Sequence, residues 1–240
     1  SGTLAGRLLV AEGRANYALL MTALTVAVTG ATGFVGRHIV AALLERGHTV
    51  RALVRDREKA IKSLPKSDRL QVVFGDVLDG HAPADLVRKS LSGGGGGGSA
   101  GGTGNAVDAV IHLIGIIREQ RGGVTFQRMH VGATRAMVEA AVEAGVPRYV
   151  QMSALGVSDH GSCGYQTTKW EAEQIVIRSG LRWTIFRPGM IHGPGSEFLK
   201  MAKGWVSGQA APWIFIPYFT RGVEDNSVPL GPVVQVDPQI

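Results

Sequence analysis

The chain has 240 residues, of which 45% are hydrophobic and 18% are charged, values typical of a globular protein with one substantial core and room for a small second lobe. Its net charge of +6 comes from scattered Lys and Arg, without a basic run interleaved with aromatic residues, which argues against a nucleic-acid partner. The single cysteine, Cys163, excludes an internal disulfide and a cysteine metal cluster, and no apolar run reaches membrane-spanning length. We therefore expect no metal site and no transmembrane segment.

Residues 1–20 carry few charged side chains and precede Met21, which looks like a natural start just before the first expected strand. We interpret them as an extension outside the fold: the remnant of a transit segment, an upstream extension or a segment left by cloning. The single cysteine fits a reducing compartment. The expected location is the cytoplasm, or an organelle matrix if residues 1–20 are a targeting remnant.

The first motif joins an apolar strand to an amphipathic helix through a turn lined with glycine. Residues 25–28 are apolar and β-branched, and Gly30, Gly33 and Gly36 follow before a helix expected over residues 38–44. Such a turn directs unpaired backbone N–H groups and the positive end of a helix dipole at one spot, which suits a pyrophosphate. The spacing GxxGxxG differs from the commonest fingerprint, and the alternative is a glycine-rich turn of another α/β protein.

The remaining pattern alternates strands with helices. Strands are expected at residues 48–54, 70–74, 109–113, 148–152 and 183–186, and helices at residues 57–64, 84–91, 125–144 and 165–179. This alternation predicts an α/β fold, a doubly wound parallel sheet with helices on both faces and ligands at the carboxyl ends of the strands. Residues 231–240 look like the start of a further strand.

Two other segments depart from this alternation. Residues 92–104 contain six consecutive glycines, which we interpret as a flexible surface insertion; a phosphate loop is the alternative, but no lysine follows at P-loop spacing. Residues 211–219 are apolar and aromatic. They pack on the core, cover the cofactor, or form a surface for a membrane-associated partner.

The end of the second strand bears on the choice of cofactor. An acidic residue at this point binds the ribose 2′-hydroxyl of NAD, whereas an arginine accommodates the 2′-phosphate of NADP. Arg55 occupies it and favours NADP(H) over NAD(H), but Asp56 follows directly, and Arg55 is alternatively a solvated charge. Asp76 and Val77, just after the third strand, are placed to meet the adenine, although Asp76 equally suits the cap of a turn.

A second set of polar residues lies downstream. Ser153 ends the fifth strand, and Tyr165 and Lys169 share one face of the following helix. An ammonium near a phenol lowers the phenol pKa, so we expect Tyr165 to exchange a proton with a substrate oxygen that Ser153 holds. Coincidence of residue types is the alternative.

These motifs together resemble a known superfamily. TGATGFVG, Ser153, Tyr165, Lys169 and RPGMIHGPG look like the atypical, extended short-chain dehydrogenases/reductases, which include NAD(P)-dependent epimerases and dehydratases. More narrowly, HLIGIIRE, MHVGATRAMVEAA, YVQMSALGV, KWEAE and SGLRWTIFRP resemble the group of the short-chain-dehydrogenase-type accessory subunit of respiratory complex I and its bacterial relatives. The resemblance covers residues 26–198.

The resemblance implies a Rossmann-like NAD(P)-binding domain over residues 21–195 and a short or truncated substrate or partner lobe over residues 196–240. It implies catalytic positions at Ser153, Tyr165 and Lys169. The cofactor-binding positions that it implies are Gly30, Thr32, Gly33, Phe34, Val35, Gly36, Arg55, Asp76, Val77, Leu113, Gly115, Lys169, Pro188 and Ile191. His130 stands where many relatives have Asn, and we interpret it as a polar helix residue with local hydrogen bonds.

Three hypotheses of function remain at this point. The resemblance favours an NADPH-binding structural or assembly component of a quinone-linked respiratory complex, NADH:ubiquinone oxidoreductase, peripheral to the membrane. The alternative is an active NADP(H)-dependent oxidoreductase or epimerase that uses Ser153, Tyr165 and Lys169. A redox-sensing regulator shares the glycine motif, but such regulators often lack the tyrosine and lysine.

Overall fold

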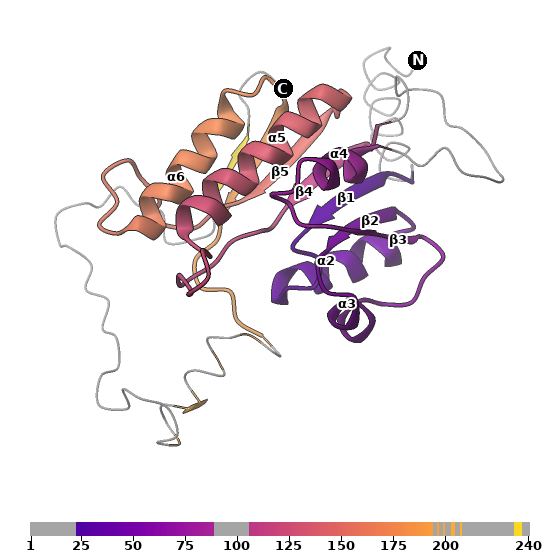
Figure 1. The fold of residues 1–240 in the computed structure, drawn as a ribbon, viewed down its shortest axis with the longest axis horizontal. Coiled ribbons are helices and arrows are strands. Elements are labelled where there is room, and N and C mark those ends of the chain that lie inside the picture. Colours follow the sequence, from indigo (N-terminus) through magenta and orange to yellow (C-terminus); the bar gives the residue numbers. More distant parts are fainter. Residues whose placement is uncertain are drawn as a thin grey trace, which may run out of the picture.

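The computed structural model describes residues 23–88 and 106–193, five single residues between 196 and 207, and the backbone of residues 233–236. Seven strands form one sheet in the order β3-β2-β1-β4-β5-β6-β7 (Figure 1). The strands are β1 (Thr25–Thr29), β2 (Thr49–Val54), β3 (Leu70–Phe74), β4 (Ala109–His112), β5 (Arg148–Met152), β6 (Arg182–Arg187) and β7 (Val233–Val236). The first six are mutually parallel, which confirms the expected α/β sheet.

The burial of each strand follows its place in the sheet. β1 and β2 are buried along almost their whole length because helices cover both faces of the sheet here. β3 lies at the edge, and its Gln71 and Phe74 are exposed. The apolar, β-branched runs of the sequence therefore became the inner strands.

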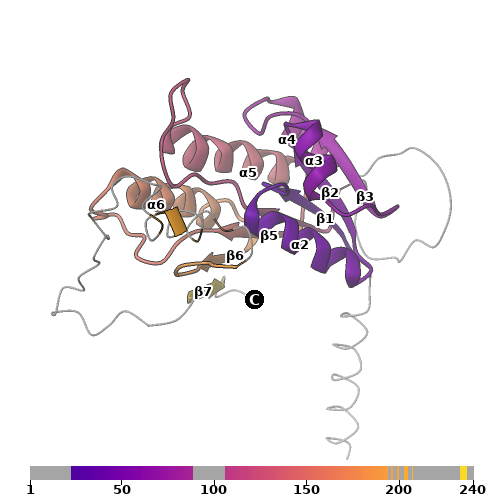
Figure 2. The same cartoon turned by 90° about the horizontal axis from the view of Figure 1, so that it is seen from below.

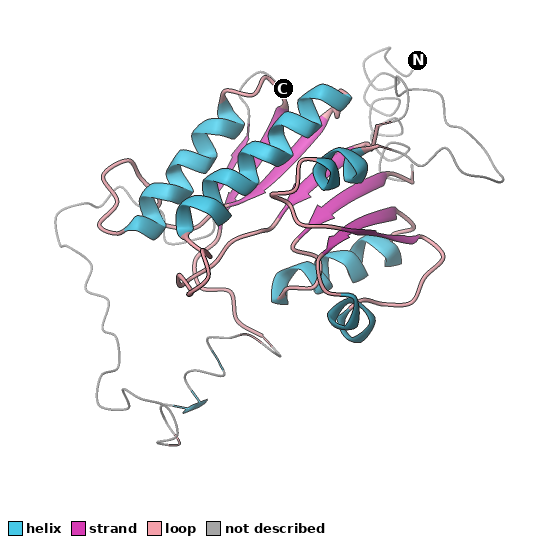
Figure 3. Ribbon diagram, in the orientation of Figure 1, coloured by secondary structure: helices cyan, strands magenta, loops and turns pink. Residues whose placement is uncertain are grey.

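Helices cover the sheet in two layers (Figures 2 and 3). They are α2 (Phe34–Glu45), α3 (Arg57–Ser63), α4 (His81–Val87), α5 (Ala133–Ala144) and α6 (Gly164–Ile177), with a π-helical segment η1 (Gln127–Gly132) before α5. α2 and α3 pack on one face, where Val40 and Ala60 share a core cluster with β1 and β2. α4, α5 and α6 pack on the other face around Leu86, Met137 and Tyr149.

Some boundaries differ from those expected. α2 begins at Phe34, directly after the glycine turn, and α4 spans His81–Val87 instead of residues 84–91. The helix expected over residues 125–144 begins as the π-helical η1, in which one extra residue per turn brings Met129, His130 and Val131 to the buried side together. Apolar periodicity predicts such a helix but not its local winding.

β7 confirms the further strand expected within residues 231–240. It pairs with β6 in the antiparallel direction, with Arg187 opposite Val233. The connection between the two strands therefore leaves the sheet and returns to it at the carboxyl end of β6.

Several expectations concern segments outside the described residues. These are the extension at residues 1–20, the glycine-rich insertion at residues 92–104 and the apolar segment at residues 211–219. The proposed division into domains stays a prediction. Within the described ranges, none of the helices combines the length and the apolar character needed to cross a membrane.

Candidate dinucleotide-binding and catalytic site

A cavity of about 1010 Å³ lies at the carboxyl ends of β1, β4, β5 and β6. This is the edge at which a doubly wound sheet binds its ligands. Twelve of the residues predicted to bind cofactor or to act in catalysis line it: Gly30, Gly33, Phe34, Val35, Gly36, Leu113, Gly115, Ser153, Tyr165, Lys169, Pro188 and Ile191. Thr32, Arg55, Asp76 and Val77 do not line it.

The glycine turn between β1 and α2 forms one wall of the cavity. Gly30 has φ +68°, a backbone conformation that residues other than glycine rarely adopt. A Cβ at Gly36 would lie 2.1 Å from the Gly30 carbonyl oxygen, so only glycine allows the helix to approach the turn this closely.

The first turn of α2 presents its backbone N–H groups without a capping side chain. The cap residue is Gly33, and the first turn contains no acidic residue that would repel an anion. Unpaired N–H groups and the positive end of the helix dipole therefore face the cavity, and this arrangement fits the pyrophosphate of a dinucleotide.

The ends of β2 and β3 carry the groups expected to contact the adenosine half. The Arg55 guanidinium donates to the Asp76 carboxylate over 3.3 Å, and both side chains are substantially exposed. The other oxygen of Asp76 accepts from the backbone N–H of Leu78, so Asp76 also caps a turn. Val77 lies in the core with 1% of its surface exposed, so the structure leaves it almost no surface that could contact a ligand.

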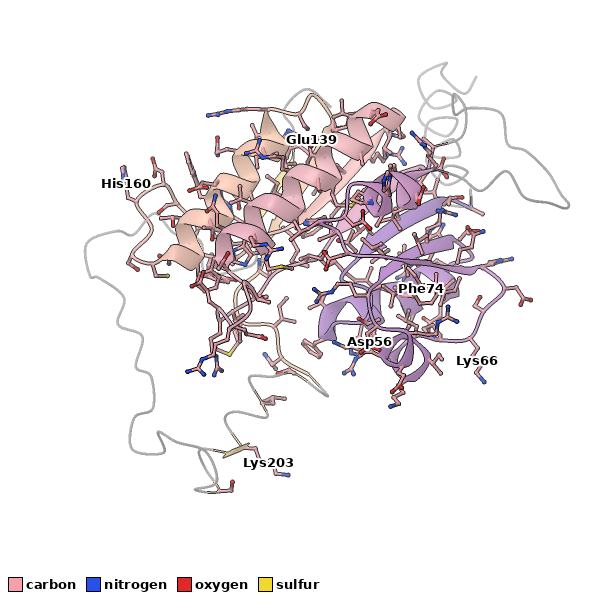
Figure 4. All side chains as sticks on the ribbon, viewed as in Figure 1. Asp56, Lys66, Phe74, Glu139, His160 and Lys203 are labelled. Atoms are coloured by element: carbon pink, nitrogen blue, oxygen red, sulfur yellow. The ribbon has the colours of Figure 1, made fainter. Side chains whose placement is uncertain are left out.

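Asp56, whose acidic side chain counted against the prediction of NADP from Arg55, has a structural role. Its carboxylate accepts from the backbone N–H of Lys59 over 3.0 Å and caps α3. Arg57 begins α3 and places its guanidinium over the ring of Phe74, 4.4 Å from the ring centroid. Figure 4 labels Asp56 and Phe74 beside α3. Two arginines, Arg55 and Arg57, thus lie at the carboxyl end of β2 and the start of α3.

Ser153, Tyr165 and Lys169 all line the same cavity as the glycine turn. Ser153 is 4% exposed, and among the described residues its hydroxyl has no hydrogen-bond partner. A buried hydroxyl without a partner is costly unless a ligand atom satisfies it. The ammonium of Lys169 donates to the Met152 carbonyl over 3.0 Å, and a Cβ at Gly115 would lie 2.9 Å from the Lys169 nitrogen.

The protonation of Tyr165 differs from the expectation. The pKa of Tyr165 is raised, first by burial and second by the neighbouring Cys163, and not lowered by Lys169. Burial also lowers the pKa of Lys169 to about 8. Desolvation penalises the charged form of each group and is the largest cause of both shifts.

His130 has local hydrogen bonds, as expected. It is buried, its Nδ1 lies 2.9 Å from the Thr168 hydroxyl, and its Nε2 lies 3.0 Å from the Ile116 carbonyl oxygen. Burial lowers the pKa of His130 to about 4, so the imidazole is neutral at pH 7. Its ring packs at 87° to the ring of Tyr165, with centroids 5.3 Å apart. The neutral imidazole therefore helps to orient Tyr165.

Other lining residues were not predicted as site residues. They are Ile116, Ile117, Arg118, Gln120, Met152, Ala154 and Ser196, whereas Gly189 and Met190 belong to the segment 188–191 that was expected beside the nicotinamide. Most follow the carboxyl end of a strand, which is the sequence signal that would have found them. Most are apolar, so the cavity beside Ser153 and Tyr165 is mainly hydrophobic.

The family comparison agrees with this geometry. Residues 30–203 match the model of a family described as NAD(P)H-binding. The chain is 31% identical over 170 residues to the ceramide reductase of Caulobacter vibrioides, covering 71% of this chain and 47% of the relative. It is 30% identical over 213 residues to a 3 beta-hydroxysteroid dehydrogenase/Delta 5-->4-isomerase of Mycobacterium tuberculosis, covering 76% and 52%. The chain spans about half the length of these relatives.

Solved structures share the fold. The Bordetella bronchiseptica enzyme WbmH in complex with NAD+ matches with a TM-score of 0.60 at 21% identity, covering 78% of this chain and 64% of that enzyme. The Escherichia coli NADPH-dependent quinone oxidoreductase QOR2 complexed with NADPH matches with a TM-score of 0.54 at 20% identity, covering 76% and 54%. With the family match and the glycine turn, these likenesses lead to one conclusion: the chain belongs to the NAD(P)H-binding family and has a Rossmann-like α/β fold.

Proposed function

We propose that this chain is an NADP(H)-dependent oxidoreductase that reduces a carbonyl group of an apolar substrate. The observation that carries the proposal is the convergence of Ser153, Tyr165 and Lys169 on the cavity that the glycine turn lines. NADP(H), when bound, supplies or accepts a hydride.

The protein groups supply the proton and hold the substrate oxygen. The unpartnered hydroxyl of Ser153 donates a hydrogen bond to the carbonyl oxygen. Because its pKa is raised, Tyr165 is protonated at neutral pH and serves as a general acid that transfers its phenolic proton to that oxygen. The resulting phenolate is stabilised by the Lys169 ammonium and then takes a proton from solvent.

Two further features support the cofactor and the substrate class. Arg55 and Arg57 lie at the strand ends that receive a 2′-phosphate, and Asp56 is engaged as a helix cap, which favours NADP(H) over NAD(H). Ile116, Ile117 and Met190 line the cavity near Tyr165. The names of two similar proteins, a ceramide reductase and a hydroxysteroid dehydrogenase, also refer to apolar molecules.

A second candidate is an NADPH-binding structural or assembly component, peripheral to a quinone-linked respiratory complex. The motif resemblance to an accessory subunit of complex I supports the same candidate.

Replacement of Tyr165 tests the enzyme hypothesis. NADPH and NADH are titrated by fluorescence, and NADPH oxidation is followed with long-chain ketones, steroid ketones and quinones. We expect Tyr165→Phe to reduce kcat by about 10²- to 10⁴-fold, because the general acid is lost, while NADPH affinity is unchanged. Undiminished turnover in Tyr165→Phe would exclude the proposed mechanism, and tight NADPH binding without turnover of any compound would favour the structural component.

A further inference from the structure

One face of α6 carries ionisable residues at four-residue intervals. Tyr165 and Lys169 line the cavity, and Glu173 lies one turn further along the helix. Glu173 is completely buried. A buried carboxylate is costly unless it is paired, so its partner indicates its role.

The partner of Glu173 is Arg187, the last residue of β6. The Arg187 Nε donates to one carboxylate oxygen over 2.9 Å, and Nη2 contacts the other oxygen. This two-pronged pair holds the guanidinium in one orientation. It connects the carboxyl end of β6 to the middle of the helix that carries Tyr165 and Lys169.

The segment after Arg187 forms a wall of the cavity. Pro188, Gly189, Met190 and Ile191 all line it. The Pro188 carbonyl accepts from the Leu155 N–H over 2.9 Å, and the Phe186 carbonyl accepts from the Ser153 N–H over 2.7 Å. The position of this wall is therefore coupled to that of Ser153 through backbone hydrogen bonds of the two residues that flank Arg187.

The negative charge of Glu173 also affects the pKa of Lys169. Lys169 also acts on the pKa values of His112 on β4 and His130 on η1, and Tyr165 lies four residues before Lys169 on α6. Burial lowers the pKa of His112 to about 3 and that of His130 to about 4, so both are neutral at pH 7. The carboxylate of Glu173 raises the pKa of Lys169 against the effect of burial.

We propose that Glu173 is a positioning residue of this site: through Arg187 it fixes the 188–191 wall of the cavity, and, four residues after Lys169 on α6, it places a carboxylate on the same helix face as that ammonium. The proposal rests on the proposed function for its consequence in catalysis, but its structural and electrostatic parts are measurable without turnover. Lys169, not Glu173, meets the cofactor.

Two variants and a matched control test this role in the full chain. Glu173→Gln removes the charge, Arg187→Lys keeps the charge but loses the two-pronged geometry, and Glu171→Gln changes an exposed carboxylate on the same helix. The pKa of Lys169 is measured by NMR on protein with 13C-labelled lysine, and NADPH affinity is measured by fluorescence. Thermal melting checks that each variant is folded.

We expect Glu173→Gln to lower the pKa of Lys169 by about one unit and to weaken NADPH binding about tenfold. Arg187→Lys weakens NADPH binding and leaves the Lys169 titration unchanged, and this arm decides the positioning role if Glu173→Gln does not fold. The proposal is wrong if Glu173→Gln leaves the Lys169 titration unchanged, or if Glu171→Gln has the same effects. If the wild-type chain binds NADPH but reduces no carbonyl compound, the proposed function fails, while the titration still decides the role of Glu173.

Discussion

At the scale of individual residues, burial is the largest cause of the pKa shifts of Tyr165 and Lys169, and the charges of neighbouring groups contribute less. Tyr165 and Lys169 share a helix face, yet the pKa of Tyr165 is raised and that of Lys169 is lowered to about 8. Each shift favours the neutral form, as desolvation requires. The site therefore holds a protonated phenol beside an ammonium that loses its proton in mildly alkaline solution.

The burial of the Lys169 ammonium predicts that the residue lowers the stability of the fold although the proposed mechanism needs its charge. Because the folded-state pKa of Lys169 lies below its usual value of 10.5, its charge destabilises the protein below pH 8, and this cost disappears as the pH rises towards 10.5. We expect Lys169→Met to abolish catalysis and to raise the free energy of unfolding at pH 7 by on the order of 3 kcal/mol.

Urea denaturation at pH 7 and at pH 9.5 measures this effect. The stabilisation should shrink at pH 9.5, because wild-type Lys169 is then mostly neutral in the folded protein. Lys66→Met, at the exposed residue labelled in Figure 4, provides the control and should leave stability nearly unchanged. An equal gain at both pH values would show that the charge of Lys169 is not the cause.

At the scale of elements, a buried arginine joins β2 to α4. Arg51 is 7% exposed, and its guanidinium donates to the carbonyls of Leu86 and Asp85, over 2.9 and 2.7 Å, and to the side chain of Gln71. These carbonyls lie in the last turn of α4, which a cation stabilises. Arg51 therefore provides hydrogen-bond donors, from inside the core, for carbonyl groups at the end of the short helix α4.

Replacement of this arginine should destabilise the fold and not the site. Lysine has one donor group and cannot reach all three acceptors, so Arg51→Lys should lower the free energy of unfolding by about 2 to 3 kcal/mol. The measurement is urea denaturation, with the exposed Arg46→Lys as control. A change below about 0.5 kcal/mol would show that water replaces the lost bonds.

For the molecule as a whole, β7 closes one edge of the sheet. β6 pairs with β5 on one side and with β7 on the other, so removal of β7 exposes a row of unpaired backbone groups on β6. We expect deletion of residues 231–240 to lower the melting temperature and to cause concentration-dependent association. Light scattering and thermal melting at several protein concentrations measure both effects; an unchanged monomer with unchanged melting would contradict the closing role of β7.

The strands and the glycine turn could be predicted from the sequence, whereas the pKa shifts and ion pairs of the site could not. The ranges of β3 and β5 agree with the expected ones, because their apolar runs end at clear breaks, and the glycine turn lines the cavity as its spacing predicts. Local rules of period and turn chemistry govern such features.

Features that depend on distant packing could not be predicted. The raised pKa of Tyr165 depends on burial, and the pairing of Glu173 with Arg187 joins residues from two elements. The capping role of Asp56 was within reach, because an aspartate directly before a helix is a common cap. Contacts between residues that are far apart in the chain leave no periodic pattern in the sequence from which they could be predicted.

The antiparallel entry of β7 also has a consequence for the length of the connection that precedes it. Because Arg187 and Val233 lie opposite each other, both ends of the connection over residues 188–232 are held on adjacent strands at one edge of the sheet. The free energy of closing a chain segment rises by only about 0.6 kcal/mol for each doubling of its length. A longer or shorter connection between these two fixed ends would therefore cost little free energy of closure, and the pairing of β1 to β6 would stay the same.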